Sequence, residues 1–168
     1  MPRLLTRASA PPQRLRVGLF GGSFNPPHEG HRHASLIALR RLGLDAVWWL
    51  VTPGNPLKDP RGLAPLSQRL KAAVDIENHP GIHVTTLESE LGTRYTADTL
   101  RALVRRFPAI NFVWIMGADN LATIHKWRDW QDIFRTMPIV VVARPGYAMK
   151  ALASPAAKLF AASRLDSS

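Results

Sequence analysis

Residues 21–31 hold the side chains best suited to chemistry in this chain of 168 residues. They read Gly-Gly-Ser-Phe-Asn-Pro-Pro-His-Glu-Gly-His and follow a short apolar run. His28 and His31 are three residues apart, so they face the same side of a helix that begins here. Two imidazoles beside a helix N-terminus are suited to donate hydrogen bonds to a phosphate and to the charge that grows in its transition state. The glycines let a ligand approach the backbone closely. This segment is therefore predicted to be a phosphate-binding, catalytic loop.

Other kinds of ligand loop do not fit the pattern. A dinucleotide fingerprint requires G-x-G-x-x-G and a P-loop requires G-x-x-x-x-G-K-S/T, and this segment has neither. The remaining histidines show no characteristic zinc-ligand spacing, so no protein-bound metal is predicted; they are His33, His79, His83 and His125. One structural interpretation stays open, in which His28 and His31 only cap a helix.

The elements that position this loop follow an alternating pattern. Short apolar runs, β-branched or aromatic and bounded by Gly, Pro or polar residues, predict strands at 15–20, 46–51, 82–85, 111–116 and 139–143. Between and after them, helical stretches are predicted at 30–42, 67–78, 96–107, 121–134 and 149–163. Thr96 is the predicted N-cap of the third helix. This alternation predicts an α/β fold with a doubly wound parallel sheet.

Residues 52–65 form a long connection with four prolines and two glycines, too irregular for a helix. Loops of this length in compact domains are often functional. In an open α/β sheet, ligands bind beyond the carboxyl ends of the strands, and this loop follows such an end. We therefore expect residues 52–65 to border the site.

Bulk properties narrow the class of protein. The chain is 46% apolar and 20% charged, and 22 Lys and Arg against 12 Asp and Glu give a net charge of +10, which attracts polyanions. It has no cysteine, which excludes disulfides and thiolate metal sites. No apolar run approaches the ~20 residues needed to cross a bilayer, so no membrane association is expected. We predict a cytoplasmic protein with a basic flexible tail at 1–14 and a single domain at 15–168.

The segment His28-x-Gly30-His31 resembles the signature of the HxGH nucleotidyltransferases, and residues 22–31 are similar to bacterial nicotinate-nucleotide adenylyltransferases in particular. Further matches occur in the family's order: Asn55-Pro56-Leu57-Lys58, Tyr95-Thr96 with Asp98-Thr99-Leu100, Gly117-x-Asp119, Trp127-Arg128-x-Trp130 and Arg144-Pro145-Gly146. The resemblance covers about residues 15–147. It implies a Rossmann-like fold of the HxGH type.

The resemblance also implies a reaction in NAD biosynthesis. The enzyme would convert nicotinate mononucleotide and ATP, used with Mg²⁺, to nicotinate adenine dinucleotide and pyrophosphate. Catalytic roles fall to His28, His31 and Lys58. ATP contacts fall to Gly21, Gly22, Ser23, Phe24, Gly30, Gly117, Asp119 and Arg144. Contacts with the pyridine mononucleotide fall to Asn25, Tyr95, Thr96 and Trp127.

Each of these residues also has an ordinary structural interpretation. Lys58 would be a solvated loop lysine, Asp119 a helix cap, Trp127 a core aromatic, and Tyr95 with Thr96 a helix start. The family also carries an Ile-Ser-Ser-Thr-x-x-Arg-like segment near its C-terminus that contacts ATP phosphates, and this chain has no such segment. We therefore expect a C-terminally truncated chain or one that lacks part of its ATP site.

Three alternative functions stay open. Phosphopantetheine adenylyltransferase resembles the chain in HxGH and in length, and a nicotinamide-mononucleotide adenylyltransferase, which uses nicotinamide rather than nicotinate mononucleotide, is the second alternative. A non-catalytic nucleotide- or RNA-binding protein on the same fold is the third, although no specific nucleic acid is expected because no RNA-binding motif is present. The sequence leaves the oligomeric state open, a homo-oligomer included.

Overall fold

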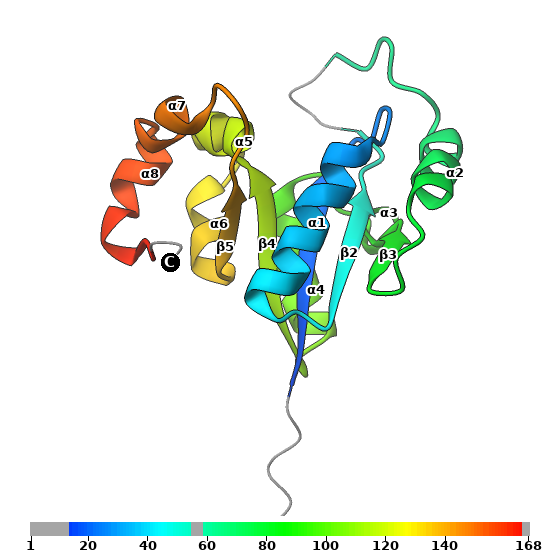
Figure 1. The fold of residues 1–168 in the computed structure, drawn as a ribbon, viewed down its shortest axis with the longest axis horizontal. Helices are drawn as coiled ribbons and strands as arrows, with labels where there is room; N and C mark the ends of the chain where they lie inside the picture. The colour runs from blue at the N-terminus through cyan, green and yellow to red at the C-terminus, as the bar shows by residue number, and fades with distance from the viewer. Residues whose placement is uncertain (1–13, 55–58, 166–168) are drawn as a thin grey trace, which may run out of the picture.

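A computed structural model describes residues 14–54 and 59–165 of the chain. At its centre is a parallel sheet of five strands in the order β3-β2-β1-β4-β5 (Figure 1). The strands are β1 (Leu15–Gly22), β2 (Ala46–Val51), β3 (Ile82–Thr85), β4 (Ile110–Gly117) and β5 (Ile139–Val142). All five lie where the sequence predicts them, with β1 and β4 longer by one or two residues at their ends. The α/β prediction with a doubly wound parallel sheet is confirmed.

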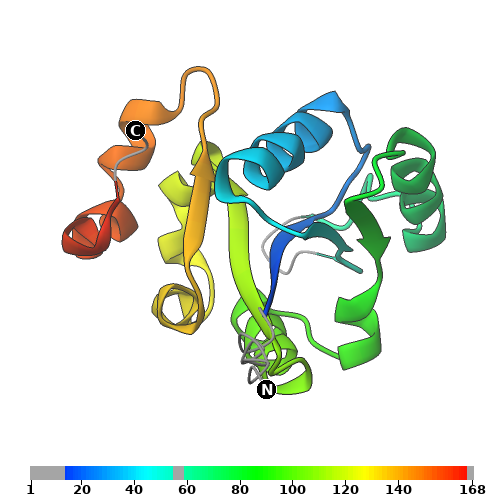
Figure 2. The ribbon, with the colours of Figure 1, turned by 60° about the horizontal axis from the view of Figure 1, so that its bottom comes forward.

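Helices cover both faces of the sheet, as Figures 1 and 2 show. On one face, α1 (Glu29–Leu42) and α2 (Leu66–Ile76) pack over β1, β2 and β3. On the other, α4 (Thr96–Arg106) and α6 (Trp130–Thr136) pack over β1 and β4. The remaining helical elements are short: α3 (Leu87–Leu91), α5 (Ala118–Thr123), η1 (Ile124–Lys126), α7 (Ala148–Leu152), α8 (Pro155–Leu159) and η2 (Ala161–Ser163).

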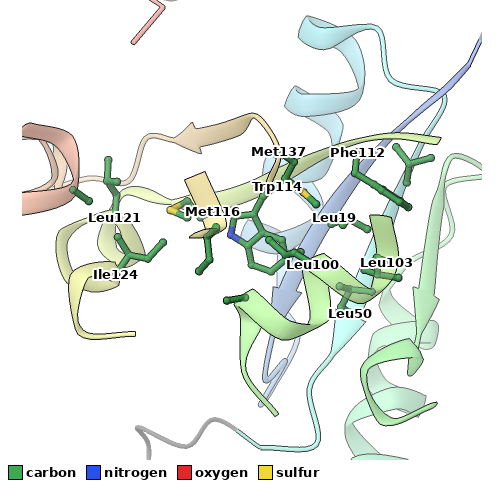
Figure 3. Packing of buried hydrophobic residues seen from close by; sticks show 14 of the residues in the cluster. Leu19, Leu50, Leu100, Leu103, Phe112, Trp114, Met116, Leu121, Ile124 and Met137 are labelled. Carbon is green, nitrogen blue, oxygen red and sulfur yellow. The ribbon is translucent and has the colours of Figure 1, made fainter. Parts of the chain in front are cut away.

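The core consists of two apolar layers, one on each face of the sheet. Neighbouring residues of β4 enter different layers, because side chains alternate along a strand. Trp114 packs with Leu19 and Leu100 beneath α4 (Figure 3), whereas Ile115 packs with Trp49 beneath α1. Burial on both faces explains why the strands read as apolar runs in the sequence.

Two of the predicted helices are interrupted. The prediction for residues 121–134 is wrong, because the chain leaves the helix after η1 and Asp129 adopts a left-handed φ of 50° before α6 begins. The prediction for 149–163 is also wrong. Pro155 occupies the first turn of α8, and the residue before a proline avoids helical backbone, so Ser154 is extended and ends the preceding segment.

Smaller differences occur at helix starts. The N-cap of α4 is Tyr95 rather than Thr96, which is the first helical residue. Helix α3 was not predicted at all.

The predicted tail lies outside the described residues except for Arg14. In the part of the chain that the structure describes, no helix has the length and apolar character needed to span a bilayer.

Candidate active site

The loop between β1 and α1 lies at the carboxyl end of the central strand. Strand β1 pairs with β2 on one side and with β4 on the other, so residues from three strand ends converge here. At this edge Gly22 pairs with Val51, and Gly117 of β4 pairs with Val142 of β5. An open α/β sheet binds its ligands at such an edge, beside the central strand where the order reverses.

His28 and His31 form a reciprocal cap on α1. His28 is the N-cap residue, and its Nδ1 accepts a hydrogen bond from the Gly30 backbone N–H at 3.1 Å. His31 Nδ1 accepts from the His28 backbone N–H, also at 3.1 Å. Both Nδ1 lone pairs are therefore used, so in each neutral ring the proton resides on Nε2. The cap leaves two Nε2–H donors, from rings whose centroids are 3.8 Å apart. The capping interpretation and the phosphate-binding interpretation are compatible.

His31 lies in an aromatic setting that favours its neutral form. Its ring centroid lies 4.7 Å from that of Phe24 and 6.0 Å from that of Trp49. Burial is the main cause that lowers the pKa of His31 to about 4, and the neighbouring His28 and Arg144 act in the same direction. At neutral pH His31 is therefore an uncharged donor through Nε2.

Glycine is required between the two histidines. A Cβ built on Gly30 would lie 2.8 Å from Nδ1 and Cε1 of His28, closer than real Cβ atoms approach their neighbours. Near the end of β1, a Cβ on Gly21 would collide with the Trp114 ring. The Gly30 contact gives a steric reason for the glycine in His-x-Gly-His.

Core packing of Phe24 and hydrogen bonds of Asn25 hold the rest of the loop in place. Phe24 has a positive φ of 47°, is 1% exposed and stacks on Trp49 at 4.9 Å between ring centroids. Its side chain therefore belongs to the core. Asn25 uses both ends of its amide on the neighbouring loop: Nδ2 donates to Gly62 O at 2.9 Å, and Oδ1 accepts from Ala64 N at 3.2 Å.

Arg69 of α2 is a residue of this region that sequence reasoning missed. Its guanidinium is buried, with the residue 2% exposed, and it donates four hydrogen bonds to backbone carbonyls. The acceptors are Ser23 O at 2.7 Å, Thr52 O at 2.8 Å, Pro53 O at 3.1 Å and Ala64 O at 2.7 Å. Arg69 thus joins the β1–α1 loop, the end of β2 and the long connection. One signal was available: Arg69 is four residues before Ala73 and shares its buried helix face.

On the β4–β5 side, Asp119 and Arg144 face each other. Asp119 Oδ2 lies 3.5 Å from an Arg144 guanidinium nitrogen, with side chains 31% and 44% exposed. A Cβ on Gly117 would collide with Asp119 Oδ1, so this glycine leaves room for the carboxylate. The charge of Arg144 also acts on the histidine loop, where it lowers the pKa of His31.

Apart from Asn25, the residues predicted to contact the pyridine mononucleotide come from two neighbouring segments. Tyr95 and Thr96 lie at the start of α4, and the guanidinium of Arg128 lies 4.7 Å from the Tyr95 ring centroid. This contact places the α4 start beside the segment that contains Trp127, which is partly buried against the core.

Lys58, and with it the Asn-Pro-Leu-Lys match, lies outside the described residues. Among the described residues, no group of three or more His, Cys, Asp or Glu side chains is arranged to hold a metal ion.

Known proteins are similar to this chain in sequence and in fold. The cytidylyltransferase-like family model matches residues 19–164. A probable nicotinate-nucleotide adenylyltransferase of Methylorubrum extorquens strain PA1 is 57% identical over 152 residues, which are 90% of this chain and 82% of the relative. One from Erythrobacter litoralis is 60% identical over 142 residues, which are 84% of this chain and 65% of the relative.

A solved structure shares the fold at low sequence identity. It is Plasmodium falciparum nicotinic acid mononucleotide adenylyltransferase complexed with NaAD. It superposes with a TM-score of 0.63 at 17% identity, covering 83% of this chain and 80% of its own.

Proposed function

This chain belongs to the nicotinate-nucleotide adenylyltransferase family, and from that membership we propose that it makes nicotinate adenine dinucleotide from nicotinate mononucleotide and ATP. The protein thereby acts in NAD biosynthesis, and we place it in the cytoplasm. The observation that carries the proposal is the pair of Nε2–H donors that the cap of α1 leaves on His28 and His31.

The reaction requires positioning rather than a covalent enzyme intermediate. A phosphate oxygen of the mononucleotide attacks the α-phosphorus of ATP in line, the bond from that phosphorus to the bridging oxygen breaks, and pyrophosphate leaves. Negative charge on the non-bridging and leaving oxygens is stabilised by fixed donors that need no reorganisation. We assign His31 and His28 to these oxygens. Because their Nδ1 atoms are held by backbone N–H groups, both rings are oriented before substrate binds.

The surrounding residues supply binding. The backbone of residues 21–24, opened by its glycines, together with Gly30 and Arg144, would face ATP phosphates, and Lys58 would bind the triphosphate. Gly117 and Asp119 would hold the adenosine. We assign recognition of the pyridine mononucleotide to Asn25, Tyr95, Thr96 and Trp127, with Asn25 acting through the loop segment that its amide already binds.

A divalent metal accompanies ATP in adenylyl transfer, and we propose Mg²⁺. The described residues offer no carboxylate cluster for a resident ion, so Mg²⁺ would be held by triphosphate oxygens and water, as is common for this small cation. When bound, it neutralises charge on the departing pyrophosphate.

The test is pyrophosphate release from Mg-ATP with nicotinate mononucleotide, with nicotinamide mononucleotide and with phosphopantetheine in parallel. We expect release with nicotinate mononucleotide at the highest kcat/KM. Release only with phosphopantetheine, or nucleotide binding with no release from any of the three, would overturn the proposal. Sedimentation of the same preparation would give the oligomeric state, for which a homo-oligomer stays a prediction.

A further inference from the structure

The short helix α3 contains a buried carboxyl group that the proposed reaction does not use. Glu88 is 7% exposed, and burial raises the pKa of its carboxyl group. Its neighbours among the described residues are hydroxyls: Thr99 Oγ1 donates to Glu88 Oε1 at 3.1 Å, and Thr52 and Thr99 both oppose the rise in its pKa. A buried carboxyl group is costly unless such partners are fixed around it.

These hydroxyls form a connected chain. Thr93 Oγ1 and Thr99 Oγ1 lie 2.7 Å apart, and Thr99 Oγ1 is also 3.2 Å from Tyr95 O. Each threonine has one proton to donate, so the chain needs an acceptor at its end. Thr99 has two acceptors within reach, Glu88 Oε1 and Tyr95 O, and when it donates to either of them it can accept from Thr93.

The backbone reinforces the same connection. Thr93 N donates to Glu88 O at 3.2 Å across the turn that Gly92 makes with a φ of 68°. Thr52 lies just beyond β2, next to which α3 packs (Figure 1). Glu88 therefore connects the carboxyl end of β2 with the turn that leads into α4, and this turn carries Tyr95 and Thr96.

We propose that Glu88 is a positioning residue for recognition of the pyridine mononucleotide: through Thr99 and Thr93 it holds Tyr95 and Thr96 at the site. The inference rests on the proposed function, which assigns these two residues to that substrate. Glu88 touches no substrate itself. Its removal loosens one substrate's site and leaves the ATP side and the histidine loop intact.

The experiment compares Glu88→Ala and Glu88→Gln with a matched control in the full chain. Glu90→Ala changes an exposed glutamate on the same helix. For each folded variant, kcat and the separate KM values for nicotinate mononucleotide and ATP are measured. Losing the buried acceptor should raise the mononucleotide KM about tenfold in Glu88→Ala. The KM for ATP should stay within about twofold. Glu88→Gln, which keeps an acceptor for Thr99, should recover most of the loss, and Glu90→Ala should behave as the unchanged protein.

A second variant tests the same inference in case Glu88→Ala does not fold. Thr99→Val keeps the side-chain shape but cuts the hydroxyl chain, and it should raise the same KM selectively. Equal changes in both KM values, or no change in folded Glu88→Ala and Thr99→Val, would overturn the inference. A lack of pyrophosphate release by the unchanged protein would instead overturn the proposed function.

Discussion

The two halves of the site differ in how firmly their side chains are held. On the β1–β2 side, the histidine cap, the Asn25 amide and the Arg69 guanidinium form hydrogen bonds of 2.7–3.2 Å to backbone groups. On the β4–β5 side, Asp119 and Arg144 face each other at 3.5 Å with about a third or more of each side chain exposed.

This difference matches the demands of the proposed chemistry. Stabilising a transition state needs donors fixed before the reaction, and a small misplacement is costly in rate. Binding an adenosine group tolerates side chains that settle on the ligand. We infer that the β1–β2 side determines kcat and that the β4–β5 side contributes mainly to the KM for ATP. The predictions below test that division.

The largest effect is expected from His31→Ala. It removes one fixed donor and the acceptor that caps the His28 N–H, so kcat should fall by about 10²–10³. Initial rates of pyrophosphate release at saturating substrates measure it. His33→Ala, an exposed histidine two residues on, is the control and should keep its rate. Unchanged turnover in folded His31→Ala would contradict the role assigned to the cap.

Arg69→Met should cost about 3 kcal/mol of unfolding free energy, because several carbonyls at the strand ends lose a buried donor. Since one of them belongs to Ser23, kcat should fall as well. Urea unfolding followed by tryptophan fluorescence gives the stability. Lys71→Met on the same helix removes an exposed ion pair and should change it by less than about 1 kcal/mol. Similar losses of unfolding free energy in both variants would mean that the buried hydrogen bonds of Arg69 stabilise the fold no more than the exposed ion pair of Lys71 does.

Acid should destabilise the β1–β2 side through His31. Its pKa is about 4 in the folded protein against 6.5 in the unfolded chain, so below pH 6.5 the unfolded state binds a proton that the folded state does not. Above pH 6.5 the titration of His31 does not change the free energy of unfolding. As the pH falls toward 4, it lowers that free energy by up to about 3 kcal/mol. Unfolding free energies measured from pH 7.5 to 4.5 should therefore fall less steeply in His31→Ala. Parallel pH profiles in the two proteins would exclude this cause.

The smallest change in stability is expected on the β4–β5 side. Asp119→Asn keeps the side-chain shape and loses only a part-exposed ion pair, so unfolding free energy should change by less than about 1 kcal/mol. The KM for ATP should rise about tenfold, the effect of losing a hydrogen bond to a charged group, with kcat nearly unchanged. Steady-state kinetics at varied ATP separates the two. A large fall in kcat at saturating ATP would place Asp119 in the chemistry and erase the difference between the halves.

The sequence predicted the sheet well because each strand is a short apolar run buried on both faces. It failed at Asp129, where a left-handed residue interrupts an apolar pattern that looks helical, and at α3, whose five residues are too short and too charged for a periodic signal. The histidine loop was identifiable because its spacing is local. Arg69 and Glu88 were not, because their roles depend on carbonyls and hydroxyls that only the folded chain brings together.

The position of β1 between β2 and β4 has a consequence for how the protein becomes active during its synthesis. Strand β1 and its loop emerge early, and β2 follows soon after, so Phe20 can pair with Trp49 while much of the chain is still unmade. Its other partner, Ile115, is made far later. Contacts between such distant residues form slowly, since a long loop must close first. A nascent chain that has not reached the end of β4 therefore has its histidine loop beside an open sheet edge. Translation pauses before residue 117 would prolong exposure of that edge, and chaperones that cover strands are expected to act at this stage.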